Sequence, residues 1–198
     1  MPCKLLLVGF EGFSKYWPNP AETLVGRLDG LQAGGCIVEA KTIPVSLQAV
    51  KQLAGSLEGY QAIMGVGLAP TARRPRLELA AVNLVDYSEP RGGEARLTPI
   101  VEDAPLTLPT GLPYREIIQA CRSKGLPLDP GASIGTYMCN ALAYTLHLHS
   151  QKTGVPAGFI HIPPDTATAM RLNMRNYTPT WILEETLKCI IHTLALLT

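Results

Sequence analysis

Charged and aromatic residues are scarce in this chain of 198 residues: Asp, Glu, Lys and Arg make up 17% of it, and Phe, Trp and Tyr 6%. The formal net charge is +1, and the sequence has neither a basic run nor a stripe of interleaved basic and aromatic residues. Proteins that bind nucleic acid or anionic membrane surfaces usually carry such basic patches. The composition therefore argues against nucleic-acid and membrane partners and favours small, nearly neutral substrates.

Long hydrophobic runs and paired cysteine motifs are also missing. The apolar run at residues 4–10 is far shorter than the ~20 residues that span a bilayer, and no signal cleavage site follows it. The five cysteines are odd in number and widely spread, without any Cys-x-x-Cys spacing. They indicate neither a disulfide framework nor a zinc site. We expect a cytoplasmic protein with reduced thiols, and no metal or organic cofactor.

The first half of the chain alternates short apolar segments with helical periodicity. Strands are expected at residues 4–10, 37–43 and 61–66, and helices at 20–28 and 46–57. Asn19 and Ser46 precede the two helices and suit their N-caps. This succession predicts an α/β fold, a three-layer sandwich in which a mainly parallel, twisted sheet carries helices on both faces.

The second half of the chain is less regular. We expect a helix over residues 113–124, a short strand near Ser133, a buried strand at 157–162 and a terminal helix from Thr178-Pro179 to Leu197. Residues 88–112 are rich in Pro and Gly and lack clear periodicity. With 46% hydrophobic residues, the whole chain, residues 1–198, is expected to form a single domain that buries roughly 70% of its unfolded surface.

A cysteine stands where an apolar stretch turns into a helical pattern. Leu142, Ala143 and Leu146 follow Cys139 at helical spacing, and Gly135 upstream allows a sharp turn. A thiol in a first helical turn is close to unpaired N–H groups and a positive partial charge, which favour a thiolate and offer donors to an oxyanion. On this stretch alone, a buried structural thiol is the more common explanation.

Other candidate residues have ordinary explanations when each is taken alone. His161 comes at the carboxyl end of a predicted strand, where open α/β sheets form binding crevices. Glu78 interrupts an apolar stretch, so it either faces solvent from an edge strand, which is the more usual case, or is a partly buried acid with a partner. His147 and His149 point to nearly opposite faces of a helix, which favours solvated or capping roles over a shared metal. The three arginines between residues 73 and 76 are more often a solvated loop than an anion clamp.

Cys139, His161 and Glu78 together are the parts that nucleophilic catalysis requires. A set of short motifs is spread over most of the chain: Val8–Phe13, Asn19-Pro20, Gly65–Ala69, Glu78–Asn83, Ile100–Pro105, Gly135–Asn140 and Gly158–Pro163. In this order and spacing they resemble the pyroglutamyl peptidase I family, also called pyrrolidone-carboxylate peptidases, whose members remove an N-terminal 5-oxoproline.

The resemblance implies an active site. The family's catalytic cysteine falls on Cys139, its histidine on His161 and its acid on Glu78. The resemblance also implies a pocket for the pyrrolidone ring, flanked by Phe10 and Phe13 and lined elsewhere by Asn19, the backbone around Gly67 and Leu68, Tyr137 and Met138. Such a pocket suits a flat, uncharged lactam, which needs apolar faces and a few fixed hydrogen bonds.

One departure from the family pattern concerns a charge. The segment Asp86–Pro90 carries Ser88 where the family pattern leads us to expect an arginine near the active site. The loss of that charge would weaken substrate placement, thiolate stabilisation or oxyanion binding, so this chain is a divergent member by resemblance.

The expected activity is that of a thiol exopeptidase, a hydrolase that acts on small peptides with an N-terminal pyroglutamate. One alternative is an amidase of altered acyl specificity on the same scaffold, motivated by Ser88 and Glu89. Another is a non-catalytic binding protein, against which the retention of all three catalytic residue types argues. The family resemblance also suggests a homo-oligomer.

Overall fold

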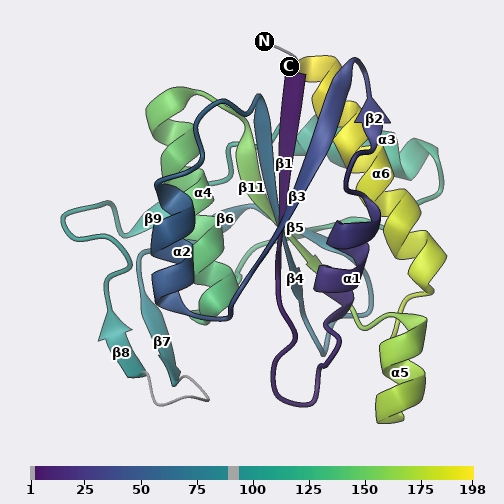
Figure 1. Cartoon of the computed structure of the whole chain (residues 1–198), viewed down its shortest axis with the longest axis horizontal. Coiled ribbons are helices and arrows are strands. Elements are labelled where there is room, and N and C mark those ends of the chain that lie inside the picture. Colours follow the sequence, from purple (N-terminus) through teal and green to yellow (C-terminus); the bar gives the residue numbers. More distant parts are fainter. Residues whose placement is uncertain (1–2, 89–93) are drawn as a thin grey trace.

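The computed structural model describes residues 3–88 and 94–198, which fold around a central seven-stranded sheet (Figure 1). Along the chain the elements are β1 (Cys3–Phe10), α1 (Pro20–Arg27), β2 (Gln32–Ala33), β3 (Cys36–Ile43), α2 (Leu47–Ala54), β4 (Ala62–Leu68), β5 (Arg76–Glu78), β6 (Ala80–Val82), β7 (Val85–Ser88), β8 (Glu94–Thr98), β9 (Thr107–Pro109), α3 (Tyr114–Ser123), β10 (Asp129–Gly131), α4 (Met138–Thr153), β11 (Ala157–Ile162), α5 (Thr166–Leu172) and α6 (Thr180–Leu197).

The strand order of the sheet is β10-β5-β11-β4-β1-β3-β2. Strands β11, β4, β1 and β3 are mutually parallel, and β10 is parallel to β5. Only the β5–β11 and β3–β2 pairs within this sheet are antiparallel. The prediction of a mainly parallel α/β sheet is therefore confirmed, and the carboxyl ends of β1, β4 and β11 meet at one edge, at the bottom of Figure 1.

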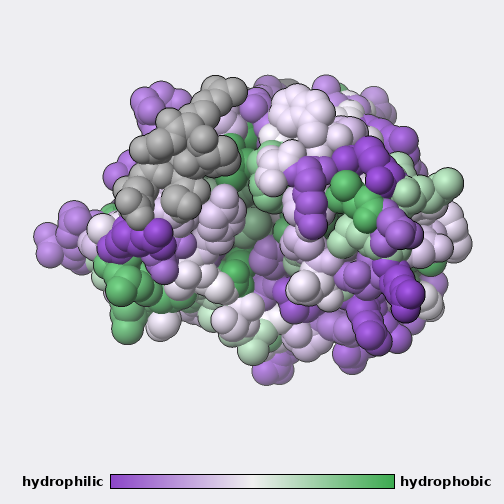
Figure 2. All heavy atoms as spheres, turned by 90° about the horizontal axis from the view of Figure 1, so that it is seen from below, coloured by the Kyte–Doolittle hydropathy of each residue, from purple (hydrophilic) through white to green (hydrophobic). Residues whose placement is uncertain are grey.

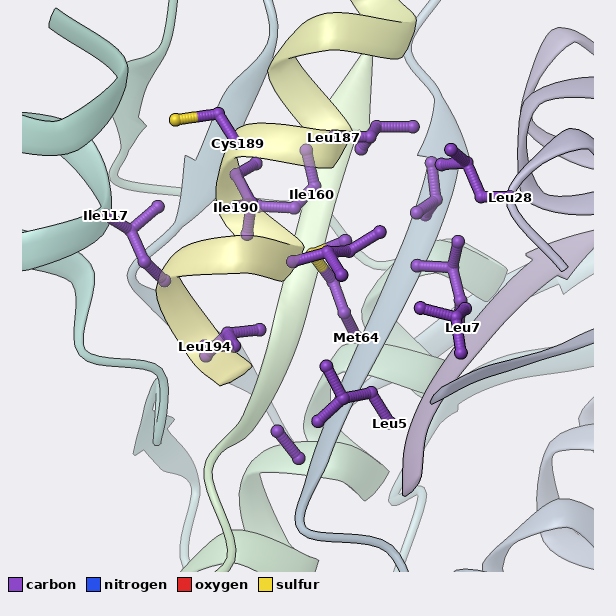
Figure 3. Packing of buried hydrophobic residues seen from close by; sticks show 14 of the residues in the cluster. Leu5, Leu7, Leu28, Met64, Ile117, Ile160, Leu187, Cys189, Ile190 and Leu194 are labelled. Carbon is purple, nitrogen blue, oxygen red and sulfur yellow. The ribbon is translucent and has the colours of Figure 1, made fainter. Parts of the chain in front are cut away.

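Helices cover both faces of the sheet because each central strand sends alternate side chains to opposite sides. Leu5 and Leu7 pack with α1, α3 and α6, as the close-up of this core shows (Figure 3). Leu6 and Val8 pack on the other side with α2 and α4. In β11 the same alternation places Phe159 on the α4 side, so His161, at the same parity, points to that side as well.

The local signals for the first two helices act as predicted. The Asn19 side chain accepts from the N–H of Ala21 and caps α1, with Pro20 at its first position. The Ser46 side chain accepts from the N–H of Ala49 and caps α2. Both caps satisfy N–H groups that have no partner within the helix.

The second half of the chain departs from the predictions in several places. The strand expected near Ser133 lies earlier, at β10. The segment after Pro163-Pro164, expected as a loop, contains α5, whose N-cap Asp165 accepts from the N–H of Thr168. The stretch 88–112, expected to be irregular, contributes β8 and β9, which pair with β7 and β6 outside the main sheet. These short strands are defined by partners distant in sequence, which periodicity does not detect.

The prediction of reduced thiols also needs correction. Cys3 and Cys36 form a disulfide, with a sequence separation of 33 residues, although reduced thiols were expected. The physical reason is the register of β1 and β3: these neighbouring parallel strands place Cys3 and Cys36 opposite each other. Sequence spacing alone does not reveal this pairing, and the cysteine pattern no longer argues for a reducing compartment. None of the helices in the described part of the chain is long and apolar enough to cross a membrane.

Candidate active site

A cavity of about 360 Å³ opens at the edge where the carboxyl ends of β1, β4 and β11 meet the start of α4. Figure 2 looks onto this edge, and apolar (green) atoms are visible in a hollow near the middle of the view. The cavity is lined by Phe10, Phe13, Asn19, Val45, Leu68, Ala69, Pro70, Thr71, Arg76, Ile134, Tyr137, Met138, Cys139 and His161. Residues of four strands (β1, β4, β5 and β11), of the neighbouring loops and of helix α4 therefore contribute to a single site.

Cys139 lies in the first turn of α4, as the sequence predicted. Gly135 has a φ of 82°, the left-handed region that glycine adopts without strain, and it turns the chain into the extended N-cap residue Tyr137. The thiol also needs space on β4: a Cβ built on Gly67 would lie 2.8 Å from the Cys139 sulfur. First-turn N–H groups have no acceptor within their own helix, so the start of α4 can donate to a negative oxygen near Cys139.

His161 lies on β11 and is almost completely buried, with 5% of its surface exposed. Its Nδ1–H donates to Glu78 Oε1 at 2.8 Å, because a carboxylate can only accept. Burial alone would lower the pKa of His161, but the charge and hydrogen bond of Cys139, followed by those of Glu78, raise it to about 9. The imidazole is therefore held between a thiol and a carboxylate and can carry a proton at neutral pH.

Glu78 lies at the end of β5 with no exposed surface, so a solvent-facing position, the more usual case, was wrong, and the alternative of a buried acid with a partner holds. The antiparallel pairing of β5 with β11 places Glu78 opposite Phe159 and Arg76 opposite His161. Arg76 Nε lies 3.5 Å from Glu78 Oε1, an ion pair longer than a hydrogen bond. The buried carboxylate thus has two cationic neighbours, His161 and Arg76.

Most of the residues expected to form the substrate pocket line the cavity. Phe10, Phe13, Leu68, Tyr137 and Met138 all line the cavity. Gly67 lies behind it, against the sulfur of Cys139.

Asn19 borders the cavity too, but its polar atoms serve the backbone. Its Nδ2 donates to the carbonyl oxygens of Phe10 and Glu11, at 3.0 and 3.2 Å, and its Oδ1 accepts from Ala21. The side chain of Asn19 therefore holds the loop that carries Phe13, because its amide groups are already bonded to the backbone.

Sequence reasoning assigned no role to two asparagines that hold the loops of the site. Asn140 accepts from the N–H of Val82 and donates to the carbonyls of Val82 and Leu84, joining the start of α4 to the segment after β5. Asn83 accepts from the N–H groups of Ile100 and Val101. Each asparagine follows a candidate catalytic or apolar motif, so its position was visible, but its partners are distant in sequence.

Some expectations for other polar residues need correction. His147 is not solvated but buried, with Nδ1 3.2 Å from the carbonyl oxygen of Leu108. Burial lowers the pKa of His147 to about 4, against smaller opposing effects of the Leu108 carbonyl and Glu78. Arg76 borders the cavity rather than lying in a solvated loop. The side chain of Ser88 and the whole of Glu89 lie outside the described residues.

Within the described residues, no group of three or more His, Cys, Asp or Glu side chains is arranged to hold a metal ion. The residues that meet at the cavity are instead those of nucleophilic catalysis: a thiol at a helix start, an imidazole beside it and a buried carboxylate behind the imidazole. Such an arrangement can attack a carbonyl carbon, shuttle one proton and stabilise the resulting oxyanion.

The sequence is similar to a known peptidase family over nearly its whole length. The family model described as pyroglutamyl peptidase matches residues 3–195. The pyrrolidone-carboxylate peptidase of Thermococcus litoralis is 36% identical over 197 residues, covering 94% of this chain and 89% of that protein. The enzyme of the same name from Pyrococcus furiosus is 34% identical over 167 residues, covering 81% of this chain and 80% of that protein.

Solved structures agree with these relatives. The pyrrolidone carboxyl peptidase of Thermus thermophilus superposes with a TM-score of 0.86 at 31% identity, covering 96% of this chain and 99% of that one. The enzyme from Thermococcus litoralis gives a TM-score of 0.88 at 28% identity, covering 98% and 93% respectively. The similarity therefore extends over the whole fold.

Proposed function

The chain belongs to the pyroglutamyl peptidase family of cysteine-type peptidases, and we propose that it removes N-terminal pyroglutamate from peptides with Cys139, His161 and Glu78 as its catalytic residues. The observation that carries this assignment is the hydrogen bond of 2.8 Å between buried His161 and Glu78, beside a thiol at the wall of the cavity. The order thiol, imidazole, carboxylate is what an acyl-transfer mechanism needs.

The thiolate of Cys139 attacks the pyroglutamyl carbonyl carbon, and the carbonyl electron pair moves to oxygen to give a tetrahedral oxyanion. N–H groups at the start of α4 stabilise this oxygen. As the C–N bond breaks, protonated His161 gives its proton to the leaving amine, which leaves a thioester on Cys139. A water molecule, deprotonated by His161, then attacks the thioester and releases pyroglutamate. Glu78 keeps the imidazole oriented and supports its positive charge.

The cavity suits a neutral five-membered lactam. Phe10, Phe13 and Leu68 provide apolar walls, against which the flat ring can be buried. An open glutamyl chain brings an ammonium and a carboxylate, and leaving these charges unpaired in such a site costs several kcal/mol. A prolyl group has the ring but no lactam carbonyl, and its amine is charged.

The activity is tested with amide reporters bearing pyroglutamyl, prolyl or glutamyl groups on the same fluorescent amine. We expect the pyroglutamyl reporter to be hydrolysed far faster, because mismatched polar groups can reduce kcat/KM by on the order of 10⁴. Equal hydrolysis of the prolyl reporter would refute the lactam pocket. If none is hydrolysed while Cys139 reacts selectively with an alkylating reagent, the amidase of altered acyl specificity becomes the better assignment.

A further inference from the structure

Arginines gather in two chain segments next to the cavity. The segment 70–76, a loop that leads into β5, carries Arg73, Arg74 and Arg76, and the segment 171–176 carries Arg171 and Arg175; neither contains Asp or Glu. The two segments are joined by Asn176, whose Nδ2 donates to the carbonyl of Pro70 at 2.7 Å. Thr178 Oγ1 also donates to the carbonyl of Arg73, at 3.1 Å. The chain as a whole has a net charge of only +1, so these arginines form a local concentration of positive charge.

Among these arginines, Arg76 reaches the cavity itself. Of the described side chains that line it, Arg76 is the one with a permanent charge. Its Nε lies 3.5 Å from Glu78 Oε1, and this is its one polar contact within the described part of the chain. The side chain is 39% exposed. The guanidinium therefore has N–H donors beyond those facing Glu78, and part of it is open to a ligand.

The sheet register places Arg76 on the side where the leaving peptide must lie. Arg76 and His161 are paired residues of β5 and β11, so their side chains are on the same face of the sheet. In the proposed mechanism His161 gives its proton to the leaving amine, which puts the first residue of the leaving peptide beside His161. That residue is therefore also the part of the substrate nearest to Arg76.

Beyond Arg76 the positive charge continues. A second hollow of about 490 Å³ is lined by Thr71, Arg73, Arg175, Asn176 and Tyr177. It shares Thr71 with the catalytic cavity, so the two hollows adjoin. Strongly hydrophilic (purple) atoms also border the right side of the central hollow in Figure 2. A peptide that leaves the cavity on this side stays in a positive potential.

Resting on the proposed function, we infer that Arg76 is a specificity residue, and that the preferred substrates are pyroglutamyl peptides with a carboxylate on the first residue after the scissile bond. A guanidinium offers two parallel N–H donors to a carboxylate, a geometry that neither an amide nor an apolar side chain matches as well. Arg73 and Arg175 add longer-range attraction for further acidic residues.

The inference is tested with two isosteric substrates, pyroglutamyl-glutamyl-alanine amide and pyroglutamyl-glutaminyl-alanine amide. They differ only in whether the side chain of the first leaving residue ends in a carboxylate or an amide, and the acyl group and the backbone are the same. We expect the purified enzyme to hydrolyse the glutamyl peptide with a kcat/KM about tenfold higher, the size of one partly exposed charge-assisted contact. This preference should shrink at high ionic strength, because salt screens exposed charges.

Arg76→Met should bring the ratio of the two kcat/KM values close to one, and Arg76→Lys should keep part of it, since lysine retains the charge without the planar fork. The matched control is Arg74→Met. Arg74 is 65% exposed, lies 4.0 Å from Asp129 and does not line the cavity, so its loss should leave the ratio unchanged.

The ratio separates specificity from support of Glu78. If Arg76 acts only by stabilising the Glu78 carboxylate, Arg76→Met lowers kcat/KM for both peptides by the same factor and the ratio stays, which overturns the inference. Equal hydrolysis of both peptides by the unmodified enzyme overturns it as well. Absence of hydrolysis of either peptide, together with an inactive pyroglutamyl reporter, refutes the proposed function instead.

Discussion

At the scale of single residues, the proposed chemistry depends on a buried histidine that keeps a proton. His161 is held by Glu78 at 2.8 Å on one side and by the Cys139 thiol on the other. Burial lowers the pKa of the imidazole, and the neighbouring Cys139 and Glu78 reverse that effect. The three residues therefore form one unit, and their removal should not have independent effects.

Cys139→Ala should abolish turnover of a pyroglutamyl reporter, since no other group can form the acyl-enzyme, and His161→Ala should come close to this. Glu78→Gln should lose less, on the order of 10²–10⁴ in kcat, because the amide oxygen can still orient the ring but supplies no charge. Steady-state kinetics with circular dichroism as a folding control measures this. Near-parental activity of Cys139→Ala would eliminate the mechanism.

The pKa of His161 also makes a prediction for pH. With a pKa of about 9, the imidazole is protonated throughout the neutral range and loses its proton as the pH rises through 9. The leaving amine then lacks its acid, so kcat/KM should fall on the alkaline side. The same sign holds for stability: the raised pKa stabilises the fold fully below 6.5, and this contribution is lost as the pH rises through about 9.

A pH profile of kcat/KM, recorded at constant ionic strength, measures the decrease at alkaline pH. Glu78→Gln removes one of the two groups that raise the pKa of His161, so its alkaline limb should move to lower pH. An unchanged limb in that variant would mean that another group controls it.

At the scale of elements, the regular first half of the chain could be predicted and the short pairings of the second half could not. Strands β1 and β4 could be predicted from apolar runs and β3 from its alternation, and the carboxyl ends of these strands fix the edge of the site. Strand β5 has only three residues, Arg76–Glu78, and its antiparallel pairing with β11 depends on a partner distant in sequence. That position decides whether Glu78 and Arg76 face solvent or the site, so periodicity could not assign them.

The contact between β4 and α4 is a second feature of the elements that periodicity does not give. A Cβ on Gly67 would lie 2.7 Å from Phe159 Cζ and 2.8 Å from the Cys139 sulfur. A Cβ on Gly65 would lie 2.6 Å from the same phenylalanine ring, at Cδ2, and has Leu146 rather than Cys139 as its other neighbour. The two glycines therefore differ mainly in whether they adjoin Cys139, the proposed nucleophile.

We expect both Gly65→Ala and Gly67→Ala to destabilise the protein by about 1–3 kcal/mol, the usual cost of overpacking. Only Gly67→Ala should also lower kcat, because it displaces the sulfur from His161. Thermal unfolding and reporter kinetics, measured for both variants, separate the two effects. A parallel loss of activity in Gly65→Ala would show that the damage comes from Phe159 and not from the position of the thiol.

At the scale of the whole molecule, the disulfide and the candidate active site lie at opposite ends of the sheet. The start of β1 and the end of α6 lie together at the top of Figure 1, whereas the cavity of the candidate active site is at the bottom edge. The Cys3–Cys36 disulfide joins the starts of β1 and β3, at the end away from Cys139. Changes to this disulfide should therefore alter unfolding without altering the catalytic residues.

A bond that closes a loop between residues 33 apart in sequence restricts the unfolded chain and should stabilise the fold by about 4 kcal/mol in the chain-entropy treatment. The Cys3→Ser/Cys36→Ser variant should lose about this amount in denaturant unfolding, while its kcat/KM stays at the parental value. The parental protein should lose a similar amount when a reductant is added, and the double variant should not respond. If the parental protein is insensitive to reductant and Cys3 can be alkylated without it, the two thiols are free and the stabilisation has another source.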